Sequence, residues 1–153
     1  MQAQRRDRKG VAQRQRPLRI AQCNVQKSAP ANTALLQLCA EEQVDIILVQ
    51  EPYFTTGRRK FHNSHPAYKA HIPIDNWKDI QTQPRVITYI RKAGSLKVEQ
   101  TRPWGACRGI LWLQTNQYSI INIYNPPLGR ERSPAITYLL NTRPAPNTLI
   151  AGD

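Results

Sequence analysis

Four consecutive aliphatic side chains, Ile46 to Val49, set the strongest limit on how this chain can fold. A run without polar alternation predicts a strand that is buried on both faces, and therefore a central strand of its sheet. Glu51 and Pro52 follow closely, and proline cannot donate to a sheet ladder, so the strand should end with Glu51 in an extended conformation. A carboxylate at the end of a central strand could bind Mg²⁺; the alternative is a solvated glutamate that opens a loop.

An earlier strand and a helix lead into this run. Residues 18–25 predict a strand that ends near Asn24, and a helix should follow from Ser28 to about residue 43. Its buried face should contain Leu35, Leu38 and Cys39. A helix of this length joins parallel neighbouring strands, so Asn24 and Glu51 are expected side by side. Asn24 would then orient the carboxylate or bind a phosphate oxygen, and the alternative is that it only forms a turn.

The rest of the chain is dominated by short strand patterns. Strands are expected at residues 68–74, 86–91, 96–101, 109–115, 118–124 and 148–151. Their near-regular spacing indicates a largely antiparallel sheet, with Asn116-Gln117 as a hairpin turn. A helix should begin at Pro134, with Ile136, Leu139 and Leu140 on its buried face.

Two of these strands also end in polar side chains. Tyr124 precedes Asn125-Pro126-Pro127, and its phenol could donate to a phosphate oxygen; the alternative is a rim tyrosine that packs on the prolines. Asp153 follows the apolar strand at 148–151. A second carboxylate there would be the partner of Glu51, as a metal ligand or as the group that takes a proton from water.

Charge and composition point to a polyanionic partner. The 153 residues fit one domain or part of one, and their formal net charge of +12 favours nucleic acid. Residues 1–17 carry +5 of this charge with few large apolar side chains, so we expect a disordered basic arm. No apolar run could cross a bilayer, and three distant cysteines favour a reducing compartment without structural zinc. We expect an intracellular, nuclear protein with no membrane partner and no small-molecule cofactor.

Residues 53–83 predict a long loop beside the site, followed by a strand. Arg58, Arg59 and Lys60 in this loop could contact nucleic-acid phosphates, although a solvated loop would have the same composition. His62 and His65 lack a nearby third ligand that would complete a zinc site, so we interpret them as loop histidines.

Four segments, in this order, carry a family resemblance. They are the strand ending in Asn24, the strand ending in Gln50-Glu51-Pro52, the segment from Asn122 to Pro127, and Ala151-Gly152-Asp153. The set resembles the endonuclease/exonuclease/phosphatase superfamily, and most closely the endonuclease domain of non-LTR retrotransposons. The resemblance covers about residues 18–153. It implies an α/β fold, part of a two-sheet α/β sandwich.

The resemblance also implies an activity and roles for the residues. It implies a Mg²⁺-dependent phosphodiesterase, with Mn²⁺ as a possible substitute, that nicks DNA and has a reverse-transcriptase region in its parent polyprotein. Glu51 would bind the metal with the support of Asn24 as a further ligand. Tyr124 would bind the scissile phosphate, and Asp153 would activate or orient the attacking water.

The sequence departs from the family at several positions. Some relatives have an acid where this chain has Gln26, and some have asparagine where it has Pro127. The family motif also continues beyond Gly152-Asp153, and a later strand end supplies a Ser-Asp-His set. We therefore expect residues 18–153 to be the N-terminal part of such a domain, C-terminally truncated and inactive alone. The alternatives are a non-catalytic nucleic-acid-binding remnant of a mobile-element protein and, third, a sugar-phosphate or lipid phosphatase.

Overall fold

The computed structural model describes residues 16–55, 61–127, 134–143 and 145–153, and within these residues the chain forms eight strands and two helices. The elements are β1 (Ile20–Asn24), α1 (Ala29–Glu41), β2 (Ile46–Gln50), β3 (Tyr68–His71), β4 (Val86–Arg91), β5 (Glu99–Thr101), β6 (Ile110–Gln114), β7 (Ser119–Ile123), α2 (Pro134–Asn141) and β8 (Thr148–Gly152). The predicted strands are present, although β3 and β5 are shorter than expected.

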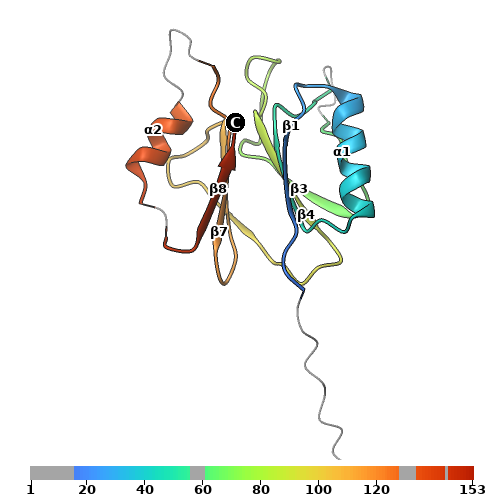
Figure 1. Ribbon diagram of the computed structural model, residues 1–153. Helices are drawn as coiled ribbons and strands as arrows, with labels where there is room; N and C mark the ends of the chain where they lie inside the picture. Colours follow the sequence, from blue (N-terminus) through green and yellow to red (C-terminus); the bar gives the residue numbers. More distant parts are fainter. Residues whose placement is uncertain (1–15, 56–60, 128–133, 144) are drawn as a thin grey trace, which may run out of the picture.

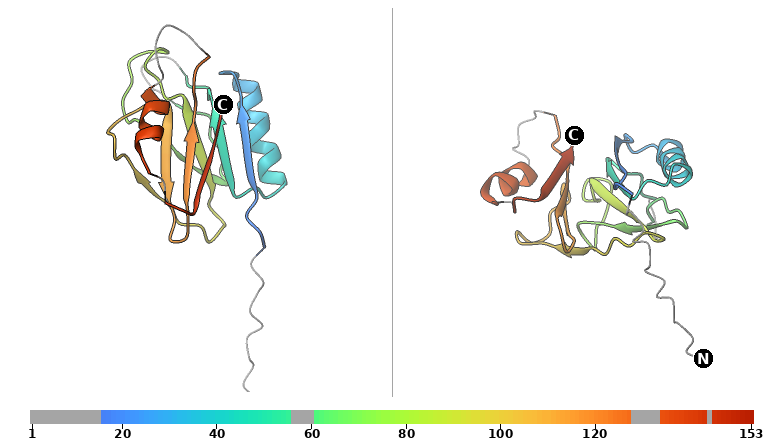
Figure 2. Two further views of the ribbon diagram at one scale, coloured as in Figure 1. Left: turned by 60° about the vertical axis from the view of Figure 1, so that its left-hand side comes forward. Right: turned by 60° about the horizontal axis from the view of Figure 1, so that its bottom comes forward.

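Two four-stranded sheets face each other, and each carries one helix on its outer face (Figures 1 and 2). The first sheet has the order β1-β2-β4-β3 and the second has the order β5-β6-β7-β8. One apolar cluster fills the space between the sheets, a second lies under α1 and a third lies under α2. The predicted two-sheet α/β sandwich is therefore confirmed.

Strand β2 lies inside its sheet, and all five of its residues are buried. It runs parallel to β1 and antiparallel to β4, as the strand-helix-strand pattern predicts for the first pair. The backbone beyond it differs from the prediction, because Glu51 has a φ of +46° and not an extended conformation. Its amide donates to the carbonyl of Arg85 (2.8 Å), and its carbonyl accepts from the amide of Lys27 (2.7 Å). These long-range bonds override the local preference imposed by Pro52.

Helix α1 begins as predicted, with the Ser28 hydroxyl accepting a hydrogen bond from the amide of Ala31 (3.2 Å). Its buried face was predicted correctly for Cys39, which is buried, and for Leu35, which packs against the same core, but wrongly for Leu38, which is 57% exposed while Leu36 is buried. The face that packs on the sheet consists of Asn32, Leu36 and Cys39. The adjacent Leu35 and Leu36 are compatible with two rotations of the helix, and packing on the sheet selects one of them.

Helix α2 packs on the second sheet through fewer side chains than predicted. Leu140 was expected on the buried face, but it is 78% exposed. The fully buried residue is Ala135, and Ile136 and Leu139 pack against the same cluster. A stack of aromatic rings adds to this interface; it consists of Trp112, Trp104 and Tyr138.

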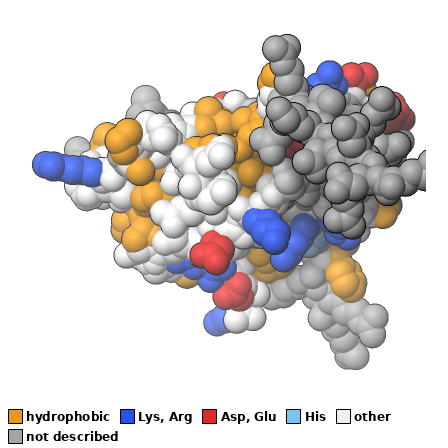
Figure 3. Space-filling view, turned by 90° about the horizontal axis from the view of Figure 1, so that it is seen from below, with side chains coloured by type: hydrophobic (Ala, Val, Ile, Leu, Met, Phe, Trp, Pro, Cys, Tyr) orange, Lys and Arg blue, Asp and Glu red, His pale blue; other side chains and the backbone are white. Residues whose placement is uncertain are grey.

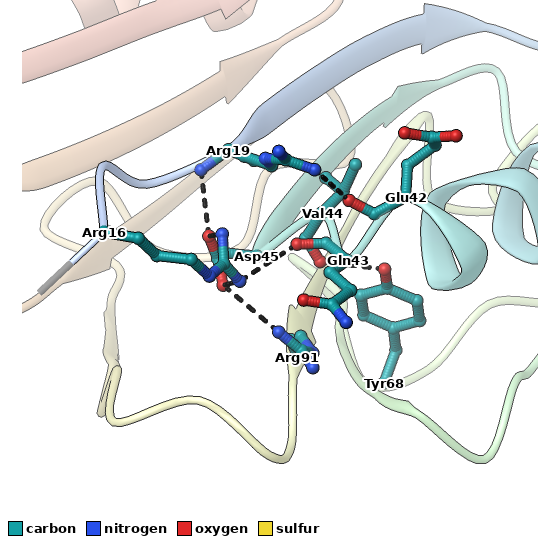
Figure 4. Close-up of polar contacts among 8 residues, drawn as sticks. All are labelled: Arg16, Arg19, Glu42, Gln43, Val44, Asp45, Tyr68 and Arg91. Atoms are coloured by element: carbon teal, nitrogen blue, oxygen red, sulfur yellow. Dashed lines mark hydrogen bonds and ion pairs between the residues drawn. The ribbon is translucent and has the colours of Figure 1, made fainter.

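The end of the sandwich where the chain enters β1 is held by Asp45. Its buried carboxylate accepts bonds from both terminal nitrogens of Arg16 (3.1 and 2.9 Å) and from the amide of Arg19 (2.9 Å) (Figure 4). Arg91 lies 3.9 Å from the same carboxylate. Figure 3 shows that described basic and acidic side chains lie close together at this end. Residues 1–15 of the predicted arm are outside the described part of the chain.

Candidate active site

The carboxyl ends of four strands meet at the other end of the sandwich. β1 is parallel to β2 in one sheet and β7 is parallel to β8 in the other, and the C-terminus lies between the two sheets (Figure 1). A cleft opens there. It is lined by Asn24, Gln26, Glu51, Tyr124, Asn125, Pro127 and Asp153. The four predicted site residues, Asn24, Glu51, Tyr124 and Asp153, are therefore close together, while their chemical roles stay predictions.

The four side chains form two hydrogen-bonded pairs. The phenol of Tyr124 donates to Oε1 of Glu51, and Nδ2 of Asn24 donates to Oδ2 of Asp153 at 2.6 Å. One backbone hydrogen bond links the two pairs. The amide of Asn125, which follows Tyr124, donates to the carbonyl of Asp153 (2.7 Å). Each pair joins a strand of one sheet to a strand of the other. The site therefore depends on the contact between the two sheets.

The electrostatics of the cleft keep Tyr124 protonated. Burial, together with the hydrogen bond and negative charge of Glu51, raises the pKa of Tyr124 to about 12. The guanidinium of Arg85 lies over the tyrosine ring, 5.3 Å from its centroid, and acts in the opposite direction. At neutral pH the phenol is thus a hydrogen-bond donor.

A buried amide network under the cleft was not anticipated from the sequence. Nε2 of Gln50 donates to Oδ1 of Asn122 (2.8 Å). Nδ2 of Asn122 in turn donates to the carbonyls of Val49 (3.3 Å) and Ile87 (3.0 Å) and to the hydroxyl of Thr88 (3.2 Å). Gln50 and Asn122 are each 0% exposed. The only sequence signal was a polar residue within each of two apolar strands. The network joins the strands that carry Glu51 and Tyr124.

The fold is similar to that of a protein of known structure. A solved structure described as the endonuclease domain of TRAS1, a telomere-specific non-LTR retrotransposon, superposes with a TM-score of 0.66 at 18% sequence identity. The two chains share a fold. The match covers 90% of this chain and 58% of the TRAS1 domain, so this chain spans less than two thirds of that domain. No protein-family model and no curated protein matches the sequence.

The similarity to the TRAS1 domain shows the fold only. Whether the cleft suits a metal ion depends on the donor atoms of its side chains. Two carboxylates and one amide supply only oxygen ligands, which suit Mg²⁺ or Mn²⁺. One oxygen of Glu51 and one of Asp153 are engaged by Tyr124 and Asn24, which leaves the second oxygen of each carboxylate for a cation. Oδ1 of Asn24 already accepts from the amide of Gln26 (2.8 Å). Asn24 therefore suits orientation of Asp153 better than direct ligation.

Other sequence predictions have different outcomes. Arg58, Arg59 and Lys60, proposed to contact nucleic acid, are outside the described residues. His62 and His65 hydrogen-bond to the carbonyl of Asn63 and the side chain of Gln37. In the described part of the chain no three His, Cys, Asp or Glu residues are grouped closely enough to hold a metal, and no helix is long and apolar enough to cross a membrane.

Proposed function

We propose that this chain carries part of a metal-dependent phosphodiesterase site that nicks DNA inside the cell, in the nucleus. The observation that supports the proposal is the convergence of Asn24, Glu51, Tyr124 and Asp153 in one cleft at the carboxyl ends of strands from both sheets. The fold shared with a domain described as an endonuclease favours phosphodiester chemistry. The net charge of +12 favours a polyanion over a small phosphate ester.

Each residue of the cleft has a distinct part in this proposal. Glu51 and Asp153 would hold Mg²⁺ or Mn²⁺, and Asn24 would fix the orientation of Asp153. When bound, the metal stabilises negative charge on the phosphate and makes water a better nucleophile. As the alternative to binding the metal, the second oxygen of Asp153 would accept a proton from the attacking water. Tyr124 has a single O–H, which it donates to Glu51, so a phosphate oxygen competes with Glu51 for that proton.

A plasmid-nicking assay with Mg²⁺ tests the activity. We expect the 153-residue chain to be inert, because metal, water and charge-stabilising donors act as one strongly non-additive unit. The extended protein for this assay adds the part of a TRAS1-type domain that this chain does not cover, and it should nick the plasmid. The Glu51→Gln variant of the extended protein should not nick, and its circular dichroism should be unchanged. Nicking by the extended protein that survives Glu51→Gln would refute the proposed role of the cleft, as would a folded extended protein that does not nick.

A non-catalytic nucleic-acid-binding protein is the second candidate. It is favoured by the high net charge and by the small acidic set in the described residues, where two carboxylates meet without a third acid or histidine. This candidate predicts DNA binding with no Glu51-dependent nicking in either form of the protein. The same assay, with binding measured in parallel, therefore separates the two candidates.

A further inference from the structure

Two arginines near the cleft, Arg85 and Arg108, each lie just before a strand. Arg85 precedes β4 and Arg108 precedes β6, and the amide of Arg85 donates to the carbonyl of Arg108 (2.7 Å). The carbonyl of Arg85 accepts from the amide of Glu51 (2.8 Å), and its guanidinium covers the ring of Tyr124. The backbone contacts thus attach this arginine pair directly to the candidate active site.

Each guanidinium has one buried donor without a partner in the described part of the protein. The Nε atoms of Arg85 and Arg108 are both buried and lack a hydrogen-bond partner there. The one hydrogen bond from either guanidinium within those residues is long, from Nη2 of Arg108 to the carbonyl of Ile80 (3.5 Å). Asp79 attracts Arg108 electrostatically, but no ion pair within 4.0 Å joins either arginine to a described carboxylate.

Other arginines of the chain have a different environment. Arg16 pairs with Asp45 at 2.9 Å, and Arg102 pairs with Asp75 at 2.9 Å. Arg108, in contrast, is subject to burial and to the positive charge of Arg85, and both lower its pKa from the ordinary value. Two half-buried cations with an unpaired buried donor each repel each other, and an anion beside them would reduce both costs.

We propose that Arg85 and Arg108 form a binding site for a backbone phosphate of nucleic acid, next to the cleft. A guanidinium is suited to this ligand because its planar set of donors matches two phosphate oxygens. A phosphate held there would lie beside Tyr124, so the pair would set the position of the strand relative to Glu51 and Asp153. The identity of the ligand rests on the proposed function, whereas anion binding by the pair can be tested separately.

The first test uses inorganic phosphate at constant ionic strength and follows thermal unfolding. Phosphate should raise the melting temperature of the wild type by about 2–4 °C, because a ligand that binds the folded state stabilises it. The shift should be smaller in Arg85→Gln and in Arg108→Gln, and absent in the double variant. Lys97→Gln, an exposed residue between β4 and β5, removes the same charge and should keep the full shift. Equal shifts in all variants would overturn the proposal.

The second test uses a fluorescent DNA duplex over a series of salt concentrations. Each arginine variant should weaken binding about tenfold and reduce the slope of log K against log salt by about 1, as loss of one phosphate contact requires. Lys97→Gln should leave the slope unchanged. Melting temperatures without ligand show whether each variant is folded, and the single variants keep the test valid if the double variant is not.

The outcomes also separate this inference from the proposed function. Glu51→Gln should abolish nicking by the extended protein and retain the phosphate-dependent shift. Phosphate and DNA binding that depend on Arg85 and Arg108, in a protein that never nicks, would support the anion site and reject the nuclease. Nicking that depends on Glu51, together with phosphate and DNA binding that depend on neither arginine, would reject the anion site alone.

Discussion

The contact between Tyr124 and Glu51 shows how single residues shape the cleft. Glu51 has a left-handed backbone, which costs a residue with a side chain on the order of 1–3 kcal/mol and is commonest at functional sites. Hydrogen bonds to Arg85 and Lys27 hold it in place. The sequence predicts the position of Glu51 at a strand end correctly but its backbone wrongly, because these partners are distant in the chain.

Tyr124 should make stability depend on pH in the alkaline range. Its pKa is raised to about 12 in the folded state, above the value of about 10 for an unfolded tyrosine. The folded state therefore retains a proton that the unfolded state loses, and this contribution to stability is complete below pH 10 and is lost as the pH rises to about 12. Over that range the wild type should lose on the order of 1 kcal/mol more than Tyr124→Phe, since solvent screens part of the interaction.

Urea unfolding at several pH values between 9 and 12 measures this difference. Burial also raises the pKa of Tyr68 to about 12. Tyr68 is present in both proteins, so its contribution cancels in the difference between the wild type and Tyr124→Phe. Parallel stability curves for the two proteins would show that Tyr124 is not held protonated by burial and by Glu51.

At the scale of elements, the contact between β2 and β7 positions the two halves of the cleft. Gln50 and Asn122 connect these strands through a fully buried hydrogen bond; Glu51 directly follows Gln50, and Tyr124 lies two residues after Asn122. The parallel pairing of β1 with β2 and the hairpin between β6 and β7 could be predicted from the sequence. The order of the strands could not, because β4 joins the first sheet and β8 pairs with β7 in parallel, where one largely antiparallel sheet was expected. The amide network could not, because its partners come from strands 72 residues apart that meet only when the sheets pack.

Asn122→Ala should destabilise the protein by about 2–4 kcal/mol, because it leaves the Gln50 amide and nearby carbonyls buried without partners. Asn116→Ala, at an exposed position of the β6–β7 hairpin, is the matched control and should change stability by less than about 0.5 kcal/mol. Chemical denaturation measures both. A loss for Asn122→Ala no larger than that of the control would show that the network does not hold the sheets together.

At the scale of the whole molecule, charge determines how the protein meets nucleic acid. Residues 1–15 carry five basic and one acidic side chain, so +8 of the +12 lies in the remaining chain. Arg16 is bound by Asp45, which makes residue 15 the natural end of a deletion. The overall charge can be read from the composition. Which arginines are paired with carboxylates cannot, because this depends on contacts between residues that are distant in the chain.

Deletion of residues 1–15 should weaken DNA binding without abolishing it, because most of the positive charge remains. Binding of both proteins should fall steeply between about 50 and 200 mM salt, as counterion release requires. Fluorescence anisotropy with a duplex of unrelated sequence provides the measurement. Binding that is lost completely with the deletion, or that does not respond to salt, would show that the folded body has no nucleic-acid surface.

Calorimetric titration with Mg²⁺ and Mn²⁺ tests the proposed metal site of the cleft most directly. The wild type should bind one cation weakly, because only two carboxylates are available and Mg²⁺ retains several waters. Glu51→Gln should lower the affinity at least about tenfold, a difference of about 1.4 kcal/mol in binding free energy. Glu99→Gln, an exposed substitution on β5, should have no effect. Equal affinity in wild type and Glu51→Gln would contradict the assignment of Glu51 as a metal ligand.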